Sequence, residues 1–175
     1  GIAKEVVTEK VAGIDGTYQY PTLDAEGNPL LTVNKGDDVT LLYKITVKGD
    51  EGAGFKVTDT GAQYVGTTTE GVKIETEDGI TGTIPAGGEV VLYVSMTHEN
   101  VTGETPLKNS ATVENTGDGE DPENPTVEEE VPVVVNPGLD SIAKEVVTEE
   151  VAGIDGTYQY PTLDADGNPL LTVNK

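Results

Sequence analysis

Three polar residues lie where the local pattern of the sequence calls for apolar ones. They are Lys4, which shares its strand parity with Ile2 and Val6; Asp59, which shares it with Phe55 and Val57; and Asn109, which shares it with Leu107, Ala111 and Val113. Because side chains in a strand alternate between two faces, a strand that buries those apolar neighbours buries the polar residue too. An unpaired buried charge is costly, so we expect each of the three to have a partner.

An intramolecular isopeptide bond would use all three residue types, on three separate strands: a lysine and an asparagine to form the bond and a carboxylate to catalyse it. Desolvation favours the neutral amine of Lys4, which is then a nucleophile. A buried Asp59 can hold a proton and donate it to the carboxamide oxygen of Asn109. The amine would attack the polarised carbon, ammonia would leave, and an amide crosslink would remain. The fold supplies most of the drive by holding the reactants together.

Each residue also has an ordinary structural interpretation. Lys4 could protect an exposed edge strand, Asp59 could cap the turn before Gly61, and Asn109 could satisfy neighbouring backbone. For any one of them alone this interpretation is the better one. The three together favour the crosslink.

The segments that would carry these residues are predicted to be strands. Apolar residues alternate with polar ones from Val39 to Val47 and from Val90 to Met96, and again over residues 131–135, where Pro132 indicates an edge strand or a strand start. Turn-forming residues separate these runs, and no window of twelve residues carries an apolar helical stripe. We predict an all-β fold, an immunoglobulin-like antiparallel β-sandwich, with a closed barrel as the alternative.

An internal repeat organises the chain. Residues 142–175 repeat residues 2–35 at an offset of 140, with changes at only two positions, Lys10 to Glu150 and Glu26 to Asp166. We therefore predict one complete repeat over residues 2–141 and the first strands of the next over 142–175, joined by a linker at 136–141. Lys144 is the repeat equivalent of Lys4.

The repeat provides two candidate segments for one domain body. In the preferred arrangement, residues 2–35 complete the domain body, residues 36–141, in cis. In the alternative, residues 142–175 fold back on the body and Lys144 replaces Lys4 as the nucleophile. Two donors for one acceptor predict strand exchange and head-to-tail assembly with other copies.

Composition narrows the possible functions. The 175 residues include no Cys, and 32 acidic residues outnumber 10 lysines, for a net charge of -22. Disulfides and thiolate metal sites are excluded, and nucleic acid and anionic membranes are disfavoured partners. No segment is apolar enough to span a bilayer, so no membrane insertion is expected.

Weaker candidates for a site lie elsewhere. The acidic residues of one Gly- and Pro-rich loop could bind calcium, although they lack EF-hand spacing and a solvated loop is the better interpretation; they are Asp118, Glu120, Asp121 and Glu123. His98 is the only histidine, and no serine has a nucleophile-elbow context. We expect no enzyme activity and, calcium excepted, no cofactor.

Five segments together resemble a known group of domains. They are Ile2–Val6, Lys35–Val47, Val57–Thr60, Ile84–Gly88 and Lys108–Val113. The chain resembles the isopeptide-forming immunoglobulin-like repeats of Gram-positive surface adhesins and pilins, and the related conserved repeat domain of envelope proteins. The resemblance implies a lysine from the first strand, an asparagine from a late strand and an acidic catalyst between them, positions that Lys4, Asn109 and Asp59 match. Residues 11–34 depart from it as a long insertion.

The resemblance implies an extracellular location, at the cell surface or in the cell wall. The preferred function is a structural spacer or stalk repeat of an adhesin or filament, with neighbouring repeats or copies of itself as partners. The alternative function is a ligand-binding adhesin module, which bound calcium could stabilise. A host or cell-surface ligand could also be bound elsewhere in the full protein.

Overall fold

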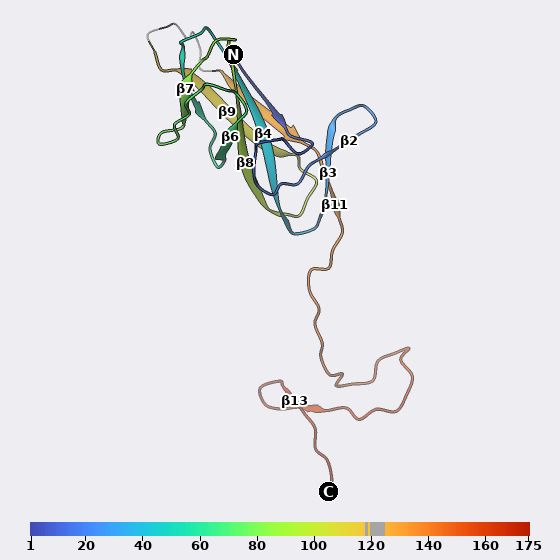
Figure 1. Cartoon of the computed structure of the whole chain (residues 1–175). Helices are drawn as coiled ribbons and strands as arrows, with labels where there is room; N and C mark the ends of the chain where they lie inside the picture. Colours follow the sequence, from blue (N-terminus) through green and yellow to red (C-terminus); the bar gives the residue numbers. More distant parts are fainter. Residues whose placement is uncertain (118, 120–124) are drawn as a thin grey trace. The chain divides into compact units, whose positions relative to one another are not determined.

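The computed structural model describes residues 1–117, 119 and 125–175. The chain divides into two compact units, Gly1–Gly138 and Leu139–Lys175, and the division falls within the predicted linker. All regular structure in the described ranges is β-strand (Figure 1). Nowhere in those ranges is there a helix long and apolar enough to cross a membrane.

Two four-stranded antiparallel sheets form the body of the first unit. The first has the order β1-β4-β8-β6, with β1 (Ile2–Val6), β4 (Asp37–Lys48), β8 (Glu89–Val101) and β6 (Gln63–Thr67). The second has the order β10-β9-β5-β7, with β10 (Thr126–Val131), β9 (Leu107–Asn115), β5 (Gly54–Thr58) and β7 (Ile80–Thr83). The runs at 39–47 and 90–96 thus form the two long central strands, β4 and β8.

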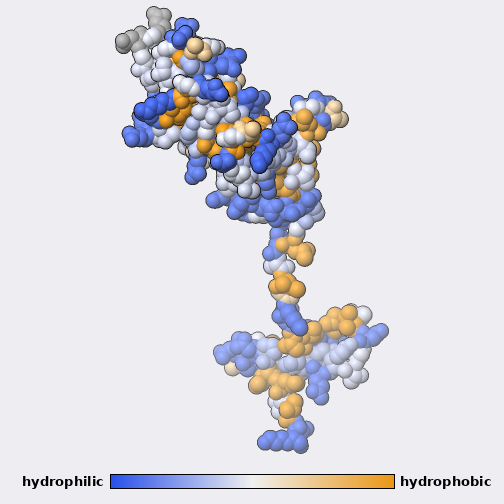
Figure 2. Space-filling view, viewed as in Figure 1, coloured by the Kyte–Doolittle hydropathy of each residue, from blue (hydrophilic) through white to orange (hydrophobic). Residues whose placement is uncertain are grey.

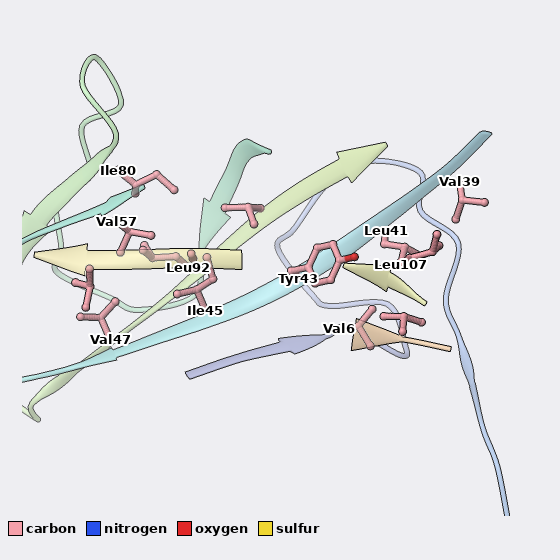
Figure 3. Packing of buried hydrophobic residues seen from close by; sticks show 14 of the residues in the cluster. Val6, Val39, Leu41, Tyr43, Ile45, Val47, Val57, Ile80, Leu92 and Leu107 are labelled. Carbon is pink, nitrogen blue, oxygen red and sulfur yellow. The ribbon is translucent and has the colours of Figure 1, made fainter. Parts of the chain in front are cut away.

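The core lies between the two sheets. Alternate residues of β4 from Val39 to Val47 point inward and are at most 3% exposed. They pack with inward residues of the second sheet, including Val57 and Ile80 (Figure 3). Burial of these side chains is the main stabilising contribution to the fold. The protein is an immunoglobulin-like antiparallel β-sandwich, as the alternation predicted.

A third sheet departs from the antiparallel prediction. It has the order β11-β3-β2, with β2 (Thr22–Leu23), β3 (Pro29–Asn34) and β11 (Val133–Asn136), and β11 runs parallel to β3. Pro132 separates β10 from β11, and both are edge strands, as its lack of a backbone N–H requires. The chain therefore leaves the second sheet at Pro132 and joins β3.

The predicted insertion, residues 11–34, covers the outer face of the first sheet before it forms β2 and β3. Leu42 and Tyr93 point outward from β4 and β8, and both are buried against Val7 and Ile14. Gln19 N–H donates to the carbonyl of Thr40 at 2.9 Å. This small second core explains why Leu42 interrupts the polar face of β4.

The second unit has the local structure of the first copy. Its hairpin consists of β12 (Thr162–Leu163) and β13 (Pro169–Leu170), which correspond to β2 and the start of β3. Asp164 Oδ1 accepts two backbone N–H groups at 2.9 Å, as Asp24 Oδ1 does in the first copy. Residues 142–146, however, form no strand, whereas their equivalents form β1. Hydrophobic side chains gather on the surface of this unit (Figure 2).

Candidate functional site: a buried lysine, aspartate and asparagine

The structure brings together the three residues that the sequence singled out. Lys4 lies in β1, Asp59 directly follows β5, and Asn109 lies in β9. The Lys4 ammonium donates a hydrogen bond to Oδ2 of Asp59, and Nδ2 of Asn109 donates to Oδ1 at 3.0 Å. The side chains of Lys4 and Asp59 are 0% and 2% exposed. A dry cluster of a nucleophile, an acid and a carboxamide thus lies at one side of the core.

Strand parity positions each member of the cluster. Lys4 pairs with Ile45 across β1 and β4 and points inward with Val6. Asp59 continues the inward parity of Phe55 and Val57 past the end of β5, and its carbonyl accepts the N–H of Ala62 at 3.2 Å in the following turn. The buried Lys4 is therefore not an exposed edge residue, and the Asp59 carboxylate faces Lys4 and Asn109.

Burial and charge act in opposite directions on Lys4. Desolvation lowers the pKa of its ammonium below the usual value, whereas the hydrogen bond and the charge of Asp59, and then the charge of Glu129, raise it. The Lys4 nitrogen also lies 5.1 Å from the ring centroid of Tyr43, in a cation–π arrangement. Burial has the largest effect, so the ammonium of Lys4 gives up its proton more readily than that of an exposed lysine.

The carboxamide of Asn109 is incompletely satisfied. Its Nδ2 also donates to the sulfur of Met96 at 2.9 Å, whereas Oδ1 is buried and has no partner among the described residues. A buried acceptor without a partner costs about 1–3 kcal/mol. This energetic cost falls on the Asn109 carboxamide, the group that would react with Lys4.

The orientation of this amide differs from the one expected. The sequence reasoning placed Oδ1 of Asn109 against a protonated Asp59, whereas the structure places Nδ2 there. An ion-paired carboxylate only accepts hydrogen bonds, so it selects the amide nitrogen. Asp59 therefore lies between the nitrogens of Lys4 and Asn109, a position from which a carboxylate could take a proton from one and give it to the other.

Three further residues border the cluster. Tyr43 packs against Lys4, Met96 contacts Nδ2 of Asn109, and Glu129 lies opposite Asn109 in the register of β9 and β10. Tyr43 and Met96 belong to alternating runs that were recognised only as core. Glu129 lies in a run of three glutamates, which locally reads as a solvated face. Glu129 could have been predicted only from its pairing with Asn109 on the neighbouring strand, and a single sequence does not reveal that pairing.

The other predicted site residues belong to the second unit or lie outside the described ranges. Lys4, not its equivalent Lys144, pairs with Asp59, and Lys144 is exposed in the second unit. The four calcium candidates, Asp118, Glu120, Asp121 and Glu123, lie outside the described residues. Within the residues that are described, no three side chains of the kinds that bind metals cluster together. His98 Nε2 lies 3.0 Å from the hydroxyl of Tyr43.

Comparison with known proteins yields a distant likeness of fold. No family model matches the chain, and no curated protein matches it. Among solved structures, it is similar to an ASH / PapD-like domain of human CEP192 (PapD-like domain 7), at 11% identity and a TM-score of 0.29. The match covers 75% of this chain and 97% of that one. A likeness this remote carries nothing about function.

Proposed function

We propose that the first unit is a structural spacer repeat, locked by an intramolecular isopeptide bond between Lys4 and Asn109 that Asp59 catalyses. The observation that supports the proposal is the pair of hydrogen bonds from Lys4 and Asn109 to the two oxygens of one buried carboxylate. A surface ion pair would need no dry site and no asparagine. This cluster holds a lysine and a carboxamide on one carboxylate, all three with almost fully buried side chains.

The reaction balances within these three side chains. Asp59 takes a proton from the Lys4 ammonium through Oδ2, which leaves a neutral amine. The amine nitrogen attacks Cγ of Asn109, Asp59 gives this proton to Nδ2 as the Cγ–Nδ2 bond breaks, and Asp59 takes a second proton from the attacking nitrogen. Ammonia leaves, the new Nζ–Cγ amide is formed, and Asp59 ends protonated by the second proton that Lys4 loses. A neutral Asp59 beside a neutral amide replaces a buried ion pair, so the product no longer bears the cost of two desolvated charges.

The bond would suit a protein that carries tension. It would join β1, the edge strand of the first sheet, to β9 in the second sheet. A force that enters near Gly1 would pass from Lys4 to Asn109 without extending residues 5–108. An extracellular spacer or stalk repeat uses that property, and the resemblance of Ile2–Val6 and Lys108–Val113 to surface-protein repeats supports the same role.

Intact mass tests the proposal. The folded chain should be lighter than its sequence mass by one ammonia, and Lys4→Met should restore the full sequence mass of that variant. Lys48→Met, which changes a surface lysine of the same sheet, should keep the deficit. A wild-type chain at its full sequence mass would contradict the proposal.

A second proposal concerns the repeated segment. Side chains that are buried in the first copy are exposed in the second: Val6 is 5% exposed and Val146 53%, Ile14 5% and Ile154 61%, and Val33 4% and Val173 69%. Residues 2–35 thus bury these side chains within the first unit, whereas the same side chains are exposed in residues 142–175. We propose that residues 142–175 pack on a body equivalent to 36–138, in the next repeat or in another copy of the chain, and so assemble the protein head to tail.

Light scattering tests this assembly. Exposed apolar surface of this kind should give the full chain a mass that rises with concentration, while a chain that ends at Ser141 stays monomeric. If both remain monomeric over the same concentrations, residues 142–175 do not recruit a second copy, and the assembly proposal is wrong for this chain.

A further inference from the structure

Glu129 connects the strand that carries the nucleophile to the strand that carries the carboxamide. It lies on β10 directly opposite Asn109, and its Oε2 accepts the backbone N–H of Val6 at 3.3 Å. Val6 lies two residues beyond Lys4 and points to the same face of β1. The side chain of Glu129 therefore starts from the residue position that pairs with Asn109, and its carboxylate contacts the backbone of β1 close to Lys4.

This contact joins two sheet edges. β1 is the edge strand of the first sheet and β10 the edge strand of the second. The outward N–H groups of an edge strand lack a ladder partner, and the side chain of Glu129 supplies one to Val6. Without it, the backbone of β1 would lose this hydrogen bond on the side that faces β10, and the placement of Lys4 would rest on the pairing with β4, on core packing and on the Asp59 ion pair.

Glu129 also differs from Asp59 in its access to water. It lines a cleft of about 600 Å³, together with Glu5, Val6, Lys44 and Tyr93, whereas the Lys4 and Asp59 side chains are almost fully buried. Burial raises the pKa of Glu129, and the charge of Glu129 in turn raises the pKa of Lys4. The titratable groups that interact with Glu129 or share its cleft are Lys4, Glu5, Glu9, Lys10, Tyr43, Lys44 and Tyr93.

We infer that Glu129 is a positioning residue for the crosslinking reaction, which anchors β1 to β10 so that Lys4 faces Asn109 and which sets the pH range of the step through its charge. The inference rests on the proposed isopeptide bond. It assigns Glu129 no proton transfer in the reaction, and the two effects are separable. The hydrogen bond from Val6 N–H to Glu129 affects the maximal rate of crosslinking. The negative charge of Glu129 affects how readily Lys4 is deprotonated.

The test follows ammonia loss with time. The full chain is made by chemical synthesis and kept in denaturant, so that it is unreacted at the start, and dilution then starts folding at a series of pH values. Aliquots are quenched in acid for intact mass, and circular dichroism follows folding separately. Glu128→Gln and Glu128→Ala, changes to an exposed residue on the same strand, are the matched controls.

The variants have distinct expected results. Glu129→Gln retains an oxygen acceptor for Val6, so its maximal rate should stay near that of the wild type, while its pH–rate midpoint moves to lower pH because Lys4 loses one neighbouring negative charge. Glu129→Ala should show the same shift and a maximal rate lower by about tenfold or more. The Glu128 variants should show neither change.

Other results would separate the failure of this inference from the failure of the proposed function. A Glu129→Ala chain that reacts at the rate of Glu128→Ala would overturn the positioning role, and an unshifted midpoint in Glu129→Gln would overturn the role of the charge. In both cases the crosslink itself would stand. A wild-type chain that folds and never loses ammonia would overturn the crosslink and the inference together.

Discussion

Nδ2 of Asn109 lies 3.0 Å from Oδ1 of Asp59, and the other oxygen of the same carboxylate accepts a hydrogen bond from Lys4. This relationship makes Asp59 more than the counter-ion of a buried lysine. It joins the two nitrogens of the proposed transamidation through one group that can carry a proton between them.

Substitution of Asp59 should abolish the crosslink. Asp59→Asn preserves the shape of the side chain but cannot take the proton of Lys4, so the variant should retain its full sequence mass. The buried ammonium also loses its counter-charge, a change that typically costs about 3–5 kcal/mol of unfolding free energy. Mass spectrometry and thermal unfolding measure the two effects. Asp78→Asn, at an exposed partner of Lys56, should keep the ammonia deficit.

Loss of the crosslink should make the domain easier to digest. Asn109→Ala removes the electrophile, and the unfolded chain regains the freedom that a bond between residues 4 and 109 would restrict. By analogy with a disulfide, this costs about 2–4 kcal/mol. The half-life in trypsin should therefore fall well below that of Ser110→Ala, a change at an exposed neighbour. Equal half-lives would show that no covalent bond protects the fold.

The second copy should be able to replace the first. In Lys4→Ala, residues 2–35 still complete the body but cannot lock it. Each cycle of unfolding and refolding gives residues 142–175 a chance to bind instead, after which Lys144 reacts irreversibly with Asn109. The fraction of chains that have lost one ammonia should rise with the number of cycles. The double variant Lys4→Ala, Lys144→Ala should lose none, and a Lys4→Ala chain that behaves like it would show that the copies are not equivalent.

His98 should make the domain less stable in mild acid. Burial lowers the pKa of His98 below its usual 6.5, so the unfolded chain binds this proton more readily than the folded one. The stability contributed by the neutral ring is complete above about pH 6.5 and is lost as the pH falls toward the folded pKa. Urea unfolding between pH 7 and pH 5 should show a smaller decline for His98→Gln than for the wild type. An identical decline in both would exclude His98 as the cause.

Local periodicity was sufficient to predict the long central strands and the inward direction of Lys4, Asp59 and Asn109. The alternation around Val39–Val47 predicts β4, and parity alone places Lys4, Asp59 and Asn109 on inward faces. Parity is a property of each strand by itself, so it is visible in a single sequence. This is why the cluster could be proposed before its geometry was known.

Long-range pairing was beyond the reach of the same reasoning. Nothing near Val133 indicates that β11 runs parallel to β3, because the partner lies about a hundred residues earlier. The orientation of the Asn109 amide depends on the charge state of Asp59, and the proximity of Glu129 to Lys4 depends on how two sheet edges meet. These features arise only when the sheets pack.

A map of tryptic peptides from the denatured wild-type chain tests the central claim most directly. Trypsin cuts after unmodified lysine, so a Lys4–Asn109 bond blocks cleavage after Lys4 and joins residues 1–10 to residues 109–144 in one branched peptide. We predict that branched peptide, lighter by one ammonia than its two parts, with fragmentation that places the link on Lys4 and Asn109. Separate peptides 1–4 and 109–144, with the Asn109 carboxamide intact, would contradict the account.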